Sequence, residues 1–91
     1  MSTEEIALVK WIRELKLRED ILKTIKREEV TYLTEISKRL KVPKSTLQRH
    51  IQKMKELELI KPTQLMLDER KVYYRLTRKG EKIYNLIIKD G

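Results

Sequence analysis

From Tyr32 to Leu59 the chain has the sequence YLTEISKRLKVPKSTLQRHIQKMKELEL. Apolar residues recur there with helical spacing in two runs, which predicts two short amphipathic helices. These residues are Leu33, Ile36 and Leu40 in the first run and Leu47, Ile51 and Met54 in the second. Pro43 lies between the runs and suits the start of a helix, because it lacks an N–H and restricts the residue before it. Two such stripes are best buried when the helices cross steeply, so a helix-turn-helix is predicted.

Before this motif we expect two helices, over residues 3–16 and 17–28, or one helix bent near Leu17. Ser2 or Thr3 can cap the first helix. The residues expected to face inward are Ile6, Val9, Trp11, Ile12 and Leu15, then Leu17, Ile21, Leu22 and Ile25. Val30 is the candidate for a short strand, and Thr31 can cap the helix that follows.

After Leu59 the spacing of apolar residues changes to two, which predicts a pair of strands. The alternating residues are Leu65 and Leu67 in the first strand and Val72, Tyr74 and Leu76 in the second. The polar residues 68–71 join them as a hairpin loop, and Pro62 fits only at the beginning or edge of a strand. Thr77 then caps a last helix from Arg78 to about residue 89, whose inward residues include Ile83, Tyr84, Ile87 and Ile88.

Together these elements predict a mainly α fold with a small β-hairpin (α+β). It is a winged helix-turn-helix with an additional N-terminal helix and a C-terminal helix. Its 91 residues suit a single domain, with a core over 17–77 and flanking helices over 3–16 and 78–90. Without cysteine, disulfides and thiolate metal sites are excluded. The acidic start without a long apolar run predicts neither a signal peptide nor a membrane span, and hence a cytoplasmic protein.

The charge is unevenly distributed along the chain. The formal net charge is +8, with +6 over residues 33–55 and +3 over residues 68–82, while residues 1–32 are neutral. Basic residues commonly serve only to solvate helices, but that role would spread the surplus evenly. Confinement to two segments indicates a site for a polyanion. Abundant Lys and Glu, with a single Asn, are also typical of thermophile proteins and fit a thermophilic or archaeal source.

The predicted second helix of the motif has the chemistry of DNA recognition on its polar face. Arg49 can donate two parallel hydrogen bonds to guanine, and Gln48 and Gln52 can pair with adenine in the same way. Contacts to phosphate are expected from basic and hydroxyl side chains near them. These residues are Lys44, Ser45, Thr46 and Lys53.

Two further segments resemble the MarR family of regulators. The run Asp68-Glu69-Arg70, followed after five residues by Leu76-Thr77-Arg78-Lys79-Gly80, is similar to the family's wing pattern D-x-R-x5-L-T-x-x-G. The segment TEISKRLKVPKSTLQRHIQKMKELELI is similar to the helix-turn-helix of that family and of the ArsR group. The resemblance covers residues 18–82. It implies that Arg70, oriented by Asp68 and accompanied by Lys71, enters a minor groove. It also implies that Ser45, Gln48, Arg49 and Gln52 lie at the major groove.

One position departs from the MarR pattern. Glu58 stands where the family usually has glycine, so the helix before it is expected to end without a left-handed glycine cap.

An enzyme is not expected. His50 is the only histidine, and no cysteine or second histidine accompanies it as metal ligand or catalytic partner, so we expect no metal. The chain has two glycines, no glycine-rich phosphate loop and no nucleophile motif, so we expect no cofactor. The sequence does not indicate whether the protein binds a small-molecule effector.

The apolar residues of the terminal helices allow two arrangements. They can close the core of one chain, or they can pair with a second chain in a two-fold homodimer, which we favour for so small a domain. The candidate dimerisation residues are Ile6, Val9, Trp11, Ile83, Tyr84 and Ile87. A dimer would present two recognition helices to successive major grooves about 34–36 Å apart.

The sequence therefore predicts a small transcriptional regulator that binds double-stranded DNA. Its recognition helix, residues 44–57, would enter the major groove, and its wing, residues 68–71, would lie at the minor groove. The alternative is a winged-helix module that binds protein, or a subunit of a transcription complex. Single-strand or RNA binding would require exposed aromatic residues, for which Tyr73 is the main candidate.

Overall fold

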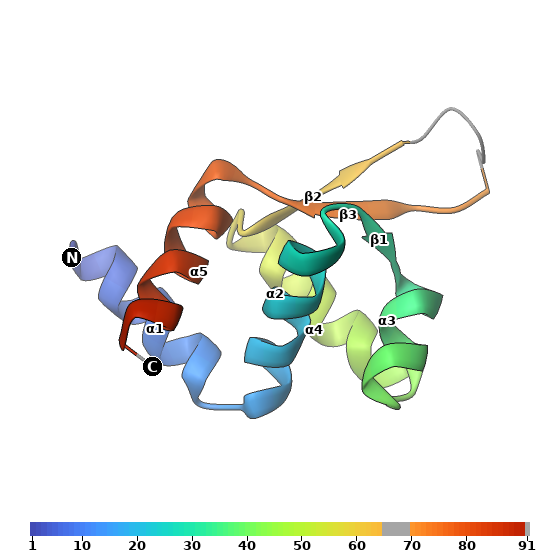
Figure 1. Cartoon of the computed structure of the whole chain (residues 1–91), viewed down its shortest axis with the longest axis horizontal. Helices are drawn as coiled ribbons and strands as arrows, with labels where there is room; N and C mark the ends of the chain where they lie inside the picture. The colour runs from blue at the N-terminus through green and yellow to red at the C-terminus, as the bar shows by residue number, and fades with distance from the viewer. Residues whose placement is uncertain (65–69, 91) are drawn as a thin grey trace.

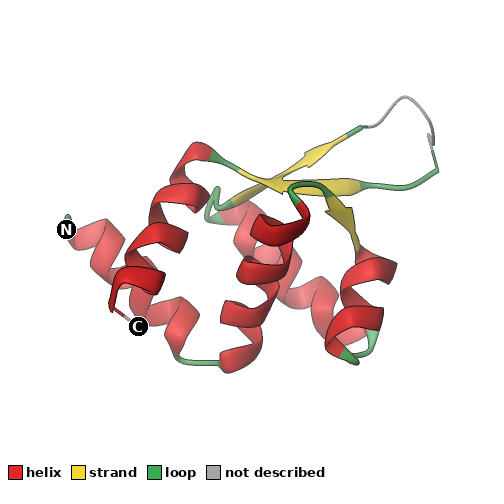
Figure 2. Ribbon diagram, viewed as in Figure 1, coloured by secondary structure: helices red, strands yellow, loops and turns green. Residues whose placement is uncertain are grey.

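The computed structural model describes residues 1–64 and 70–90 (Figure 1). In chain order its elements are α1 (Thr3–Arg13), α2 (Lys16–Glu28), β1 (Thr31–Tyr32), α3 (Leu33–Leu40), α4 (Lys44–Glu56), β2 (Ile60–Thr63), β3 (Tyr73–Leu76) and α5 (Arg78–Asp90). The helices lie on one side of the sheet, and the described part of the β2–β3 hairpin projects beyond them (Figure 2). The predicted winged helix-turn-helix with a helix at each end is confirmed. Within the described ranges, no helix has the length and apolar character needed to cross a membrane.

The N-terminal segment forms two helices that meet at Glu14 and Leu15. The break comes before Leu17, so the first helix ends earlier than the predicted residue 16. Ser2 caps it, because the Glu5 N–H donates to Ser2 Oγ at 3.1 Å and the Ser2 N–H donates to Glu5 Oε1 at 2.8 Å.

The capping carboxylate is stabilised in its charged form. The backbone N–H of Ser2 and the ammonium of Lys82 lower the pKa of Glu5 from 4.5 to about 2. Because the folded pKa lies below the unfolded one, this group stabilises the fold fully above pH 4.5. We expect that contribution to be lost as the pH falls towards 2.

The sheet is antiparallel with the order β1-β3-β2, so β3 is its central strand. Thr31 pairs with Tyr74 on one side of β3, and Pro62 pairs with Tyr74 on the other. Pro62 therefore lies in an edge strand, as predicted, where its missing N–H breaks no ladder.

The positions of the strands differ from the prediction in three respects. The first hairpin strand runs over Ile60–Thr63, earlier than expected, and Leu65 and Leu67 lie outside the described residues, as does part of the predicted 68–71 loop. Val72 precedes β3 and is 54% exposed. The short strand begins after Val30, and Thr31 belongs to it instead of capping α3. Pairing with β3, which no local pattern encodes, determines all these boundaries.

Positive φ angles occur after three helices, at charged residues instead of glycines. Glu29 has φ 66°, Lys41 has φ 57° and Glu58 has φ 60°. After α4, the Leu59 N–H donates to the Met54 carbonyl at 2.9 Å, which is the hydrogen bond of a Schellman motif. The cap without glycine expected at Glu58 thus keeps the left-handed geometry that glycine usually provides.

Replacing Glu58 by glycine should stabilise the protein. A side chain in the left-handed region carries a steric cost that glycine avoids, so the free energy of unfolding should rise by about 1 kcal/mol. Urea denaturation measures the change. Lys10→Gly is the control, because Lys10 is exposed within α1 and glycine there should lower stability by about 0.7 kcal/mol. Equal losses in both variants would contradict the strain at Glu58.

One core fills the space between the helices and the sheet. Its fully buried side chains include Ile12, Ile21, Leu22, Ile25, Ile36, Leu47, Met54, Leu59, Ile83 and Ile87. The predicted inward positions of Ile6, Leu15 and Ile88 are wrong, because these side chains are 54%, 46% and 48% exposed.

The terminal helices α1 and α5 pack against each other within one chain. Val9, Ile83 and Ile87 are buried there, so these three candidate dimerisation residues close the core of their own chain. Trp11 and Tyr84 are half-buried at its margin. Arg13 adds a link between the helices by donating to the Ile87 carbonyl at 3.1 Å.

The junction between α4, β3 and α5 is tightly built. As predicted, Thr77 caps α5: the Gly80 N–H donates to its Oγ1 at 2.9 Å. The same hydroxyl donates to the Glu58 carbonyl at 2.5 Å, and the Thr77 N–H donates to the Leu59 carbonyl at 3.0 Å. The start of α5 is therefore held against the end of α4.

Candidate nucleic-acid interface

The turn between α3 and α4 orients the second helix of the motif. Lys41 ends α3 in the left-handed conformation, and the Pro43 carbonyl accepts the first N–H groups of α4, from Thr46 and Leu47. Ser37 Oγ closes the turn by donating to the Val42 carbonyl at 2.6 Å. With this geometry Leu47, Ile51 and Met54 enter the core, so the opposite, polar face of α4 lies outward.

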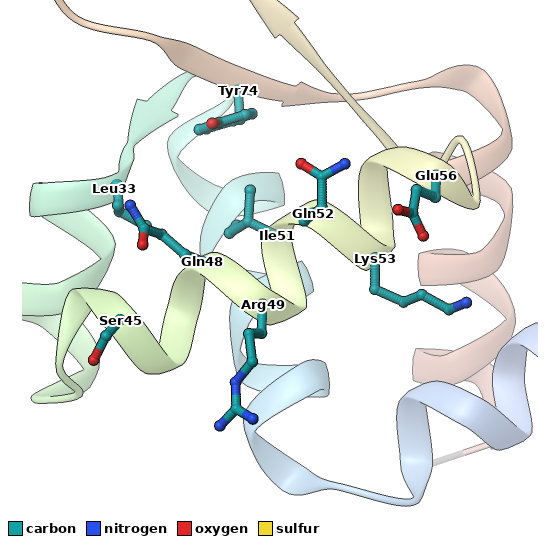
Figure 3. A pocket seen from close by; sticks show the side chains of 9 residues that line it. All are labelled: Leu33, Ser45, Gln48, Arg49, Ile51, Gln52, Lys53, Glu56 and Tyr74. Atoms are coloured by element: carbon teal, nitrogen blue, oxygen red, sulfur yellow. The ribbon is translucent and has the colours of Figure 1, made fainter.

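The predicted base-reading residues lie on this outward face. Ser45, Gln48, Arg49 and Gln52 are all exposed. Gln52 points towards Tyr74 of the sheet, whereas the Arg49 side chain extends away from it (Figure 3). Of the residues expected to contact phosphate, Lys44 and Lys53 are exposed and Thr46 is half-buried.

Most basic side chains of the helix-turn-helix have no acidic partner among the described residues. Arg39 is the exception, because it pairs with Glu28 at 2.6 Å and with Glu35 at 3.4 Å. Lys38, Lys41, Lys44, Arg49, Lys53 and Lys55 form no ion pair with any described residue. On other helices, Lys23 pairs with Glu19 at 3.2 Å and Lys26 with Glu81 at 2.6 Å. These cations of α4 therefore have no acidic partner in the described part of the chain and are available to an anion.

His50 is a half-buried residue of α4, close enough to Arg18 at the start of α2 to be affected by its charge. Burial, followed by the positive charges of Arg18 and Arg49, lowers the pKa of His50 below its usual value of 6.5. Arg18 is held by Trp11, with its guanidinium 4.1 Å from the ring centroid and Nη1 donating to the Trp11 carbonyl at 2.7 Å. Its surroundings therefore favour the neutral form of His50 more than water does.

The described part of the wing carries its two predicted cations. Arg70 and Lys71 are exposed, and the Lys71 ammonium lies 4.4 Å from the centroid of the Tyr32 ring. Tyr32 in turn meets Tyr73 edge to face, with centroids 5.3 Å apart. Asp68, expected to orient Arg70, lies outside the described residues.

A hollow of about 560 Å³ lies between α4 and the sheet (Figure 3). We name it the α4–sheet hollow; its lining includes Leu33, Ser45, Gln48, Ile51, Gln52 and Tyr74. The alternating pattern placed Tyr74 in a strand but did not indicate its position beside the recognition helix. Only the pairing of β3 with β1 and β2 brings Tyr74 there, and no local sequence signal would have identified it.

Comparison with known proteins agrees with the fold. A family model of a helix-turn-helix domain matches residues 16–63, more than half of the chain. Among proteins of curated function there is no match. Among solved structures, a mutant of ZitR from Lactococcus lactis is similar with a TM-score of 0.76 and 27% identity, over 82% of this chain and 51% of that one.

Two other structures share the fold at lower identity. A mutant of MarR from E. coli complexed with operator DNA has a TM-score of 0.74 and 21% identity, over 78% of this chain and 51% of its own. NadR in complex with 4-hydroxyphenylacetate has a TM-score of 0.80 and 16% identity, over 96% of this chain and 62% of its own. The chain thus spans about half the length of ZitR and MarR. It belongs to the helix-turn-helix domain family, in the winged form that MarR-type regulators have.

Proposed function

We propose that this protein is a small transcriptional regulator that binds double-stranded DNA in a sequence-specific manner. The observation that carries the proposal is the exposed face of α4, whose cations Lys44, Arg49 and Lys53 have no acidic partner among the described residues. A helix is the element that a major groove admits, and a polar, basic face provides the donors that base edges and phosphates accept. The shared fold with MarR, solved in complex with operator DNA, supports the same function.

The side chains of α4 divide by their chemistry. Arg49 would donate to guanine O6 and N7, and Gln48 would pair with adenine. Ser45 and Gln52 lie on the same face and complete the major-groove surface. The phosphate contacts, from Lys44, Thr46 and Lys53, would set the orientation of the helix without reading sequence.

The wing would add a contact at the minor groove. Arg70 and Lys71 are exposed and precede β3 in the chain. A narrow minor groove has the negative potential that attracts such side chains. By resemblance to the MarR pattern, Asp68 would orient Arg70.

We also propose that the chain acts as one domain over residues 1–91 and associates as a two-fold homodimer through α1 and α5. Ile6 on α1 and Ile88 on α5 are apolar and at least 48% exposed, as is Met1, which precedes α1. Because Val9, Ile83 and Ile87 serve the core of the chain itself, the outer residues would make the contact, with Trp11 and Tyr84 beside them. Two copies of α4 would then read an inverted repeat.

The test is binding to a pool of random duplex DNA, with selection and ranking of the bound sequences. Arg49→Ala should reduce the discrimination between preferred and disfavoured base pairs by about 1–3 kcal/mol, since a bidentate contact to guanine is lost. Lys53→Ala is the matched control on the same helix, and should weaken binding to all sequences equally. If Arg49→Ala leaves the ranking unchanged, the base-reading role is wrong. If the unmodified protein binds no duplex, the proposed function is wrong.

A protein-binding role has less support. It would require apolar side chains on the exposed face of α4, and the exposed residues there are polar or charged.

A further inference from the structure

We propose that the α4–sheet hollow seats the sugar–phosphate strand that separates the major groove from the next minor groove, and that Tyr74 is a positioning residue which donates to one of its phosphates. This inference rests on the proposed DNA binding and deepens it. It adds a residue from the sheet to the contacts expected from α4 and the wing.

The position of the hollow matches the shape of a DNA duplex. Neighbouring major and minor grooves are divided by one backbone strand. A protein with a helix in one groove and a hairpin at the other must therefore accommodate that strand between the two elements. The hollow occupies this place: α4 forms one wall and β3, through Tyr74, forms another (Figure 3).

The side chains that line the hollow have the chemistry of a phosphate contact. Ser45 and Tyr74 provide hydroxyl donors, and among the described residues neither side chain has a hydrogen-bond partner. Hydroxyl donors of this kind commonly contact phosphate oxygens. Leu33, which is half-buried, contributes apolar surface against which a deoxyribose can pack.

The charged residues that border the hollow also favour an anion. Arg49 and Lys53 also border the hollow, and Glu56 is the only acid among the residues that line it. A phosphodiester carries one negative charge, which two cations near the opening would attract and orient. The lining thus combines attraction at its border with neutral hydrogen-bond donors inside.

Tyr74 is also held rigidly enough to position a phosphate. It lies in the central strand and pairs with Thr31 and Pro62, so its backbone is fixed on both sides. Tyr73, the preceding residue, projects from the opposite face of the strand and packs on Tyr32. The two tyrosines therefore form a matched pair, one facing the hollow and one facing away.

The experiment compares Tyr74→Phe with Tyr73→Phe, each of which removes a single hydroxyl. Binding is measured by fluorescence anisotropy on a duplex selected from the random pool and on a scrambled duplex. Tyr74→Phe should weaken binding to both duplexes by about tenfold, as expected for one hydrogen bond to a charged acceptor. Tyr73→Phe should match the unmodified protein. The slope of affinity against salt should not change, because no charge is removed.

Replacing single phosphates by neutral methylphosphonate then locates the contact. At one position, the methylphosphonate should lower the affinity of the unmodified protein. The Tyr74→Phe variant, which already lacks the contact, should bind the modified and the natural duplex with equal affinity.

Three results would overturn the inference. If Tyr74→Phe and Tyr73→Phe bind the duplexes with equal affinity while the unmodified protein binds DNA, the proposed role of the α4–sheet hollow is wrong. The proposed function then still stands. If the losses are confined to the selected duplex, the hollow holds a base and not the backbone. If the unmodified protein binds no duplex at all, the proposed function fails together with the inference.

Discussion

Gly80→Ala is expected to lower the free energy of unfolding by about 3 kcal/mol, which is the upper range for forcing extra atoms into a packed site. A Cβ at this position would lie 2.0 Å from the Leu59 carbonyl oxygen and 3.0 Å from its carbon. These are backbone atoms, so no side-chain rotation relieves the clash. The measurement is urea denaturation followed by circular dichroism.

The surrounding hydrogen bonds explain why α5 cannot move away from Leu59 without a large loss of stability. The Leu59 carbonyl already accepts from the Thr77 N–H, and Thr77 Oγ1 is bonded both to Gly80 and to the Glu58 carbonyl. Moving α5 away from Leu59 would break these contacts together.

Asn85→Ala is the control for Gly80→Ala. Asn85 is exposed in the same helix, so alanine there should raise stability slightly through its helix propensity. If Gly80→Ala behaved like this control, the close approach of α5 to Leu59 would be wrong.

The second large effect is expected from salt. Each phosphate that the protein neutralises contributes about −0.9 to the slope of log affinity against log salt. With Lys44 and Lys53 at phosphates, the slope is about −1.8 per chain, a loss of about twelvefold between about 50 mM and about 200 mM salt. Anisotropy titrations on a labelled duplex measure this slope directly.

A matched pair of lysines tests which charges produce the salt effect. Lys53→Ala should make the slope less steep by about 0.9, because Lys53 has no acidic partner among the described residues. Lys23→Ala should leave it unchanged, since Lys23 lies on α2 and pairs with Glu19 at 3.2 Å. Equal slopes for the two variants would show that α4 does not provide the phosphate contacts.

The helix-turn-helix and the chemistry of its exposed face can be predicted from local sequence patterns. The spacing of Leu47, Ile51 and Met54 specifies which side of α4 is buried, because helical periodicity is a local property. The same spacing leaves Gln48 and Arg49 exposed. The cap at Thr77 was likewise predictable, since it depends on neighbours within three residues.

The pairing of the apolar stripes and the positions of the strands depend on long-range packing. Periodicity marks α1 and α5 as amphipathic but does not identify the partner of either, and the fold packs them against each other, with Ile6 and Ile88 outside. The start of β2 at Ile60 and the place of Tyr74 beside α4 depend on hydrogen bonds between strands distant in sequence. Such contacts are governed by the packing of the whole chain, so no local pattern of residues encodes them.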